Sequence, residues 1–449
     1  MLAREIIDPS DNIYYAASIQ QGSASMTRSN IRKWSTSNKS DDVGIACLND
    51  KVAVNPMQYA SDWINNQLRQ INQGKPILTK SSFRKHDHDE EPATKVQPLI
   101  NYNKFDNVSL VWGKPRQPSM GPQEWATFLD SEGRVMNPQA LRKRIFYGGL
   151  ENSLRKEVWK FLLGYHSYDS TYAERKLLAS VKKSEYETIK NQWKSISREQ
   201  AKRFSKFRER KDLIDKDVVR TDKSISFYDG NDNPNVNVLR DILMTYSFYN
   251  FDLGYCQGMS DLLSPILYVM RDESESFWCF VALMERLGPN FQLDQNGMNT
   301  QLFALSKLVE LLDGLLHNYF KQKDCLNYLF CFRWILIQFK REFEFEKTLR
   351  LWEVLWTQHL TEHLHLYVCV AILKRYRSKI IGEKMDFDTL LEFINELGGH
   401  IDLETTLRDA EALCLCAGEY GAARIPPGTP PSLPIQNLLL FSQEDDDVM

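Results

Sequence analysis

The sequence lacks the cysteine pairs that zinc sites and disulfide-stabilised domains use. It has eight cysteines in 449 residues, but no two of them have the C-x-x-C spacing. Most of them fall inside apolar segments with helical periodicity, so we interpret them as buried, reduced thiols. This use of cysteine is typical of a cytosolic protein and provides no framework for a structural metal.

Long apolar runs are missing as well. No window of the sequence approaches the ~18 consecutive apolar residues that a membrane-spanning helix requires. The N-terminus carries charged residues too early for a secretory signal and lacks its long apolar core. We therefore expect a soluble, cytoplasmic protein, whose contact with any membrane is peripheral.

Neither sign of charge dominates the composition. There are 56 lysines and arginines against 59 aspartates and glutamates, which gives a net charge of −3. This balance gives no indication of nucleic acid as a partner, because nucleic acid selects strongly basic surfaces. Apolar residues make up 43% of the chain and aromatic residues 12%, with ten tryptophans, so the sequence has the material for a substantial core.

Changes in composition and in apolar periodicity divide the chain into four parts. Residues 1–104 are polar and predicted to be mostly disordered, apart from a short amphipathic helix at 56–71. Residues 105–144 are interpreted as a short linker or collar, and residues 145–415 carry the main domain. Residues 416–449 form a proline-rich and acidic tail that is predicted to be disordered. A proline-rich ligand for a partner domain is an alternative interpretation of this tail.

The main domain is predicted to be all-α. Apolar residues recur at helical spacing from the segment LRKRIFYGGLENSLRKEVWKFLLGY onward. At least six further segments beyond residue 272 show the same period and are separated by short polar joints. Because strand-like alternation is nearly absent, a multi-helix fold is the prediction for 145–415.

Two short signatures organise this domain, IDKDVVRTD at 214–222 and GYCQGMSDL at 254–262. The first contains Arg220 just after a short helical turn, and the second contains Gln257 before an apolar run. No nucleophile, carboxylate pair or metal-binding cluster accompanies them in the sequence. An arginine can neutralise negative charge and a glutamine can orient a water, but neither attacks a substrate alone. The pair is therefore typical of a protein that assists a phosphoryl transfer carried out by another protein.

The same residues also have structural interpretations. Arg220 is flanked by Asp217 and Asp222, and exposed ion pairs of this kind are common and contribute little stability. Gln257, taken alone, is also compatible with a polar residue at the start of a helix. Both interpretations stay open on these residues alone.

Two further segments have competing interpretations. The segment HLTEH at 359–363 matches the spacing of a zinc-protease motif. It lies between two apolar helical segments, however, so we interpret it as an interhelical joint. The basic segment 198–211 is either a solvated helix face or a rim that attracts an acidic or phosphate-bearing partner.

Three motifs, taken in order, resemble those of the TBC-domain family of Rab GTPase-activating proteins. The opening motif is GGLENSLRKEVWKFLLG, the second is I-x-x-D-x-x-R and the third is Y-x-Q-G. The residues that match are Arg155, Trp159, Ile214, Asp217, Arg220, Tyr255, Gln257 and Gly258. Each motif alone is a weak signal, whereas all three in the family's order form a specific match. The resemblance covers roughly residues 145–400 and implies a multi-helix TBC fold.

The resemblance implies a role for each residue of the two central signatures. Arg220 is expected to be an arginine finger, and Gln257 is expected to orient the attacking water in place of the GTPase's own glutamine. Asp217 is expected to hold the guanidinium or to cap a turn. Tyr255 and Gly258 are expected to shape the loop that presents Gln257.

The resemblance also implies a partner, a Rab-family small GTPase in its GTP form. GTP and Mg²⁺ belong to that partner, so no phosphate-binding G-x-x-x-x-G-K-[ST] motif, cofactor or metal is expected in this chain. Arg155 is expected to be a buried hydrogen-bonding anchor and Trp159 a core residue. The rival interpretation is a catalytically idle Rab-binding adaptor or scaffold.

Within the family, the segment EWATFLDSEGRV and the extended match resemble the branch that acts on late-endosomal or vacuolar Rabs. This branch implies a role in vesicle and endosomal traffic. It also implies a cytoplasmic protein that associates peripherally with endosomal or lysosomal membranes.

Overall fold

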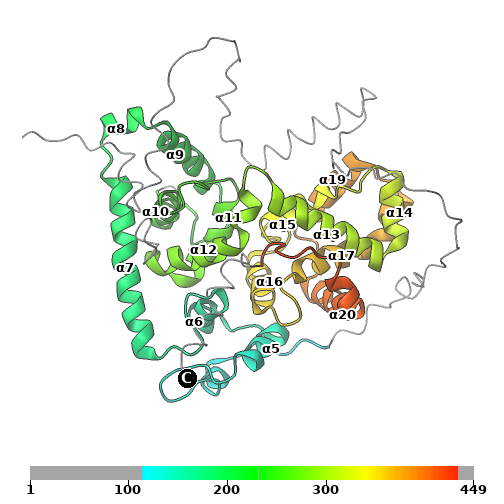
Figure 1. Ribbon diagram of the computed structural model, residues 1–449, viewed down its shortest axis with the longest axis horizontal. Helices are drawn as coiled ribbons and strands as arrows, with labels where there is room; N and C mark the ends of the chain where they lie inside the picture. The colour runs from blue at the N-terminus through cyan, green and yellow to red at the C-terminus, as the bar shows by residue number, and fades with distance from the viewer. Residues whose placement is uncertain (1–113, 231, 433–449) are drawn as a thin grey trace, which may run out of the picture.

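The computed structural model describes residues 114–230 and 232–432 (Figure 1). The polar region 1–104 with its predicted helix at 56–71, the beginning of the predicted collar and residues 433–449 lie outside the described residues.

The described residues form an all-α fold, which confirms the predicted fold class. Two isolated β-bridges, Met120 with Leu150 and Leu129 with Val135, are the strand-like pairings among them. The helices of the first half are α4 (Pro122–Ala126), α5 (Pro138–Gly148), α6 (Asn152–Leu163), α7 (Tyr172–Lys194), α8 (Arg198–Arg203), α9 (Ser205–Val218), α10 (Pro234–Tyr249), α11 (Met259–Met270), α12 (Glu273–Leu287) and η2 (Gly288–Phe291). Those of the second half are α13 (Asn296–Leu312), α14 (Gly314–Gln322), η3 (Leu329–Cys331), α15 (Phe332–Leu336), α16 (Phe345–Thr357), α17 (Leu364–Arg375), α18 (Arg377–Gly382), α19 (Phe387–Glu396) and α20 (Leu403–Ala422).

Many of these helices begin where the sequence supplies a capping side chain. Thr171 forms a capping box with Glu174 at the start of α7, so that two backbone N–H groups gain a partner. Asn233 accepts from the backbone N–H of Asn235, and Pro234 occupies the first position of α10. The polar loop before α10 thus starts the helix as well as forming a surface turn.

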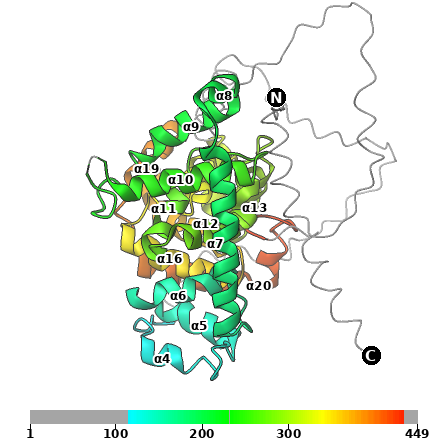
Figure 2. The ribbon, with the colours of Figure 1, turned by 90° about the vertical axis from the view of Figure 1, so that its left-hand side faces the viewer.

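The helices are arranged in two groups that lie side by side (Figure 1). In the first group α10 packs against α7 and α9, and α11 packs against α12. In the second group α17 packs against α13 and α20. Figure 2 shows α7 running the height of the first group, from the region of α4 to α6 up to α8. The two signatures lie in the first group, at the end of α9 and the start of α11.

A buried carboxylate joins the opening helices to α16. Glu353 is fully buried and accepts hydrogen bonds from Arg155 Nε at 2.7 Å, Trp159 Nε1 at 3.3 Å and the Leu150 backbone N–H at 3.1 Å. Arg155 also bonds Glu346 at 2.7 Å. Buried charges persist when they are paired and hydrogen-bonded in this way, so the opening motif of the domain contributes architecture.

The helices extend beyond the boundaries predicted for the main domain. Helix α5 crosses the boundary at 144/145, and α20 crosses the one at 415/416. Residues 416–432 belong to the folded body, because Thr429 is fully buried and its carbonyl oxygen lies 2.9 Å from His363 Nε2. Composition suggested a disordered tail, but the proline-rich segment gains order from contacts with a distant joint. Among the described residues, no helix has both the length and the apolar character that crossing a bilayer requires.

Candidate functional site

Arg220 lies in the turn that follows α9, and its side chain is 54% exposed. Its Nη2 donates to Oδ1 of Asp217, one turn earlier in the chain. Asp217 is buried, with 7% of its side chain exposed. The guanidinium is thus tethered to the protein through one terminal nitrogen, while the side chain as a whole stays more than half exposed. Because Arg220 is more than half exposed, this tether still leaves the arginine accessible to another molecule.

The second oxygen of Asp217 joins the first signature to the second. Tyr255 is buried and its hydroxyl donates to Asp217 Oδ2 at 2.6 Å. Burial, together with the negative charge of Asp217, raises the pKa of Tyr255 well above its usual value. The phenol therefore stays protonated and keeps donating. One carboxylate holds both Arg220 and the residue two positions before Gln257.

Two further side-chain contacts connect the first signature to α11. Thr221 Oγ1 and Ser260 Oγ lie 2.9 Å apart, and both residues are buried. Ser264 donates to Asp222 Oδ2 at 2.6 Å. The turn that carries Arg220 is therefore fixed against the first two turns of α11 by these two contacts. Asp217, at the end of α9, adds its contact with Tyr255 just before α11.

Gln257 occupies the last position before the residue that caps α11. Its side chain is half-buried and makes interactions within the protein. Gly258, the capping residue, has φ +102°, a left-handed conformation that side chains disfavour. A Cβ at Gly258 would also lie 3.1 Å from Ile337 Cγ2, just after α15. Gly258 thus allows a sharp entry into α11 and a close approach of the end of α15, directly after Gln257.

The structure separates Arg155 and Trp159 from this group. Both lie on α6 and bond Glu353 of α16, as described above. Trp159 also packs edge-on against Trp356, with ring centroids 4.8 Å apart. Their contacts are with the core, which agrees with the architectural interpretation of both residues.

The geometry also includes residues that sequence reasoning missed. Thr221, Ser260 and Ser264 connect the first signature to α11, and Lys340 and Arg341 pair with Asp222 and Asp261, respectively. Thr221 and Ser260 lie inside the two signatures, so their closeness in sequence to Arg220 and Gln257 could have indicated them. Lys340 and Arg341 lie about 80 residues or more further along, and their segment FKREF has no spacing that indicates a site.

The HLTEH segment is an interhelical joint between α16 and α17. His359 packs against the ring of Phe146, with centroids 5.3 Å apart, and His363 contacts the Thr429 carbonyl. Throughout 114–230 and 232–432, no group of three or more His, Cys, Asp or Glu residues is arranged to hold a metal ion. His359 and His363 thus contact other parts of the fold at this joint.

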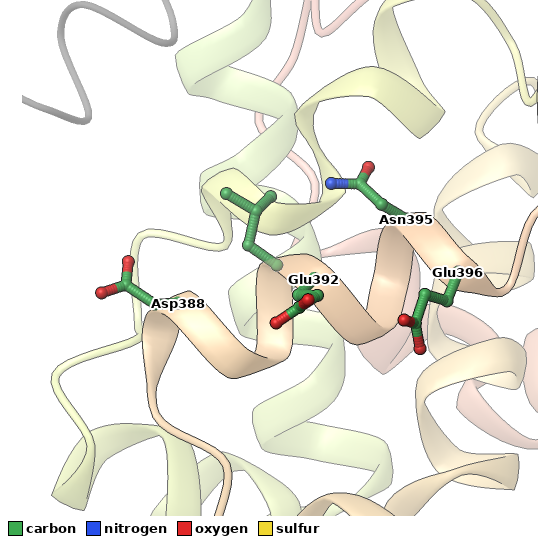
Figure 3. A pocket seen from close by; sticks show the side chains of 5 residues that line it. Asp388, Glu392, Asn395 and Glu396 are labelled. Carbon is green, nitrogen blue, oxygen red and sulfur yellow. The ribbon is translucent and has the colours of Figure 1, made fainter.

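A surface pocket lies on α19, in the second group of helices (Figure 3). It is lined by Asp388, Leu391, Glu392, Asn395 and Glu396, all from this one helix. Its side chains carry negative charge and offer no cation, so it would repel a phosphate group. The two signatures contribute no residue to it.

Fold and site together define an all-helical protein that presents an arginine and a glutamine from two segments tied to each other by buried hydrogen bonds. The chain belongs to the Rab-GTPase-TBC domain family, because the family's model matches residues 152–381, about half of the sequence.

Two relatives agree with this membership, and a solved structure has the same fold. The chain is 47% identical to human TBC1 domain family member 17 over 327 residues, which is 73% of this chain and 50% of the relative. It is 38% identical to the GTPase-activating protein GYP7 of Yarrowia lipolytica over 343 residues, 71% of this chain and 47% of the relative. The chain thus spans about half the length of these curated relatives. The crystal structure of the YPT/Rab-GAP domain of GYP1P has the same fold, with a TM-score of 0.57 at 23% identity, over 66% of this chain and 98% of that one.

Proposed function

We propose that this chain is a GTPase-activating protein that accelerates GTP hydrolysis by a Rab-family small GTPase in its GTP form. The observation that carries the proposal is the division of Asp217 between Arg220 and Tyr255. This sharing ties the exposed cation of Arg220 to the loop that carries the amide of Gln257. A GTPase that receives both groups from its activator gains a cation that neutralises charge and an amide that orients the attacking water. The relatives named GTPase-activating proteins support the same proposal.

In this mechanism the GTPase supplies GTP and Mg²⁺, and the chain supplies charge and orientation. The γ-phosphoryl group passes through a loose transition state whose negative charge spreads over its oxygens. Arg220 neutralises that charge with its guanidinium, and it can bridge two oxygens because its donors form a planar fork. Gln257 accepts from the attacking water through its carbonyl oxygen and donates through its amide.

The proposal also covers the cellular process and the location of the protein. We propose that the chain acts in vesicle and endosomal traffic as a cytoplasmic protein that is peripheral on endosomal or lysosomal membranes. Support comes from exposed basic side chains on α8 and α9: Arg198, Lys202, Arg203, Lys206, Arg208 and Lys211. Such side chains are attracted to anionic lipid headgroups by about 1 kcal/mol each near the surface. Co-sedimentation with phosphatidylserine vesicles, compared with neutral vesicles, tests this part, and equal recovery with both would contradict it.

The test of the main proposal is single-turnover GTP hydrolysis across a panel of purified Rabs. The parent chain is compared with Arg220→Ala and Gln257→Ala, and with Arg203→Ala as a matched control that removes an exposed arginine on α8. We expect strong acceleration of one or a few Rabs, lost in both finger variants and kept in the control. If Rabs bind in the GTP form without acceleration, the chain is an adaptor and the proposal is wrong.

A further inference from the structure

Two adjacent cationic residues contact one signature each. Lys340 and Arg341 lie in the loop between α15 and α16. Lys340 Nζ lies 2.7 Å from Asp222 Oδ1, in the turn that carries Arg220. Arg341 donates to both oxygens of Asp261, at 3.2 and 2.8 Å, in the first turn of α11. One loop therefore reaches both segments that the proposed mechanism uses.

The Lys340–Asp222 pair is well placed to fix the turn of Arg220. The two side chains are only 6% and 12% exposed, and removing one partner of such a pair leaves an uncompensated charge. Asp222 also has φ +49°, a left-handed conformation that costs free energy in a residue other than glycine. The ion pair, together with the hydrogen bond from Ser264, holds this backbone conformation two residues after Arg220.

The Arg341–Asp261 pair fixes the other segment. Asp261 is buried and lies four residues after Gln257. Arg341 binds it through two parallel N–H donors, and this bidentate geometry defines orientation as well as distance. Ile337, three residues before Lys340, also lies close to Gly258, so the same segment approaches the capping position of α11 as well.

We propose that Lys340 and Arg341 are positioning residues that set the placement of the two fingers relative to each other. Lys340 acts on Arg220 through Asp222, and Arg341 acts on Gln257 through Asp261. Since neighbouring Cα atoms are held about 3.8 Å apart, the pair forms a short link between the two segments. This inference rests on the function proposed above.

The experiment measures steady-state activation of a responsive Rab by Lys340→Met and Arg341→Gln. We expect kcat to fall about 10- to 100-fold, because a misplacement of roughly 1 Å costs this much in rate, while KM stays within about twofold. Lys340→Arg is expected to recover most of kcat, since it keeps the charge next to Asp222. Lys374→Met is the matched control, because Lys374 is equally buried and pairs with Asp313 in the second helix group.

A second readout separates positioning from a general structural role. Affinity is measured for the Rab loaded with GDP and aluminium fluoride, which mimics the transition state, and for the Rab loaded with a non-hydrolysable GTP analogue. Lys340→Met should weaken only the first complex. Combined with Arg220→Ala, it should cause no further loss of affinity for that complex. Arg341→Gln should likewise add no loss to Gln257→Ala. The double variant Asp222→Asn/Lys340→Met, which leaves no unpaired charge, is used if Lys340→Met unfolds, and it should show the same kcat loss.

The outcomes are distinct. Full activity of the Lys340 and Arg341 variants, equal weakening of both complexes, or losses no larger than those of Lys374→Met would overturn the positioning role and leave the proposed function intact. A parent chain that activates no Rab would overturn the proposed function, and this inference with it.

Discussion

At the scale of the residue, the central feature is an arginine that is held by a buried carboxylate and stays more than half exposed. Arg220 donates a hydrogen bond from Nη2 to Asp217, and the second oxygen of Asp217 accepts one from the Tyr255 hydroxyl. A buried carboxylate with two charge-assisted or strong donors is well compensated. Asp217 is therefore stable as a buried acceptor, while Arg220 stays exposed enough to contact a partner.

Arg220→Lys tests whether geometry or charge matters. Lysine keeps the positive charge but has no planar fork, so it can contact one phosphate oxygen where arginine bridges two. We expect activation of the responsive Rab to fall by roughly 10²-fold or more, since an arginine finger contributes about 10³–10⁵ in rate. The measurement is single-turnover hydrolysis with thermal unfolding as a control for folding. Activity within a few fold of the parent chain would refute the finger assignment.

At the scale of the element, the start of α11 is the feature on which the backbone direction at Gln257 depends. The apolar run after Gln257 forms α11, and Gly258 turns the chain into it with a left-handed φ. The same glycine lies against Ile337, so the backbone direction at Gln257 depends on both local strain and the packing of the segment after α15.

Gly258→Ala is expected to destabilise the protein and also to lower its activity. The left-handed φ alone costs an alanine about 1 kcal/mol or more, and the new Cβ would push against Ile337. Gly399→Ala is the matched control, because Gly399 has φ +79° but no heavy atom within 4 Å of its Cβ position. Urea unfolding and GTPase activation are measured for both. Equal activity of the two variants would contradict a role for Gly258 in directing Gln257.

At the scale of the whole molecule, buried polar groups connect the parts. Glu353 connects α6 to α16 through Arg155 and Trp159. His365 on α17 donates from Nε2 to Gln301 Oε1 on α13 at 2.8 Å. Such contacts join helices that are distant in the sequence, so they report on the stability of the domain as a unit.

Arg155→Met is expected to reduce the free energy of unfolding by about 3–5 kcal/mol, because it leaves Glu353 buried without its main counter-charge. The double variant Arg155→Met/Glu353→Gln removes both charges and should recover part of this loss. Urea unfolding measures both. A loss below about 1 kcal/mol for the single variant would show that the ion pair does not support the fold.

His365 makes stability depend on pH. Burial lowers its pKa to about 3, whereas a histidine in an unfolded chain titrates near 6.5. Below pH 6.5 the unfolded state therefore binds a proton that the folded state does not, and stability falls by about 1.4 kcal/mol per pH unit. Between pH 7.5 and 5.5 the parent chain should lose about 1.4 kcal/mol more than His365→Gln in urea unfolding. Equal losses would show that His365 accepts a proton in the folded protein.

The sequence by itself determined the features that depend on near neighbours. Helical periodicity, capping residues such as Thr171 and the motifs that contain Arg220 and Gln257 all reside in short segments, where spacing translates directly into geometry. This is why the all-α fold and the family were predictable. The boundary at 415/416 was not predictable, because composition does not reveal the contact between the distant residues Thr429 and His363.

Only the tertiary structure decided which residues meet. Asp217 and Tyr255 are 38 residues apart, and Lys340 is 118 residues from Asp222. Such contacts follow from how helices pack, and a single sequence has no spacing rule for that packing. Arg220 and Gln257 were therefore identifiable as chemical groups, whereas the shared carboxylate and the Lys340–Arg341 link that hold their segments together became visible in three dimensions.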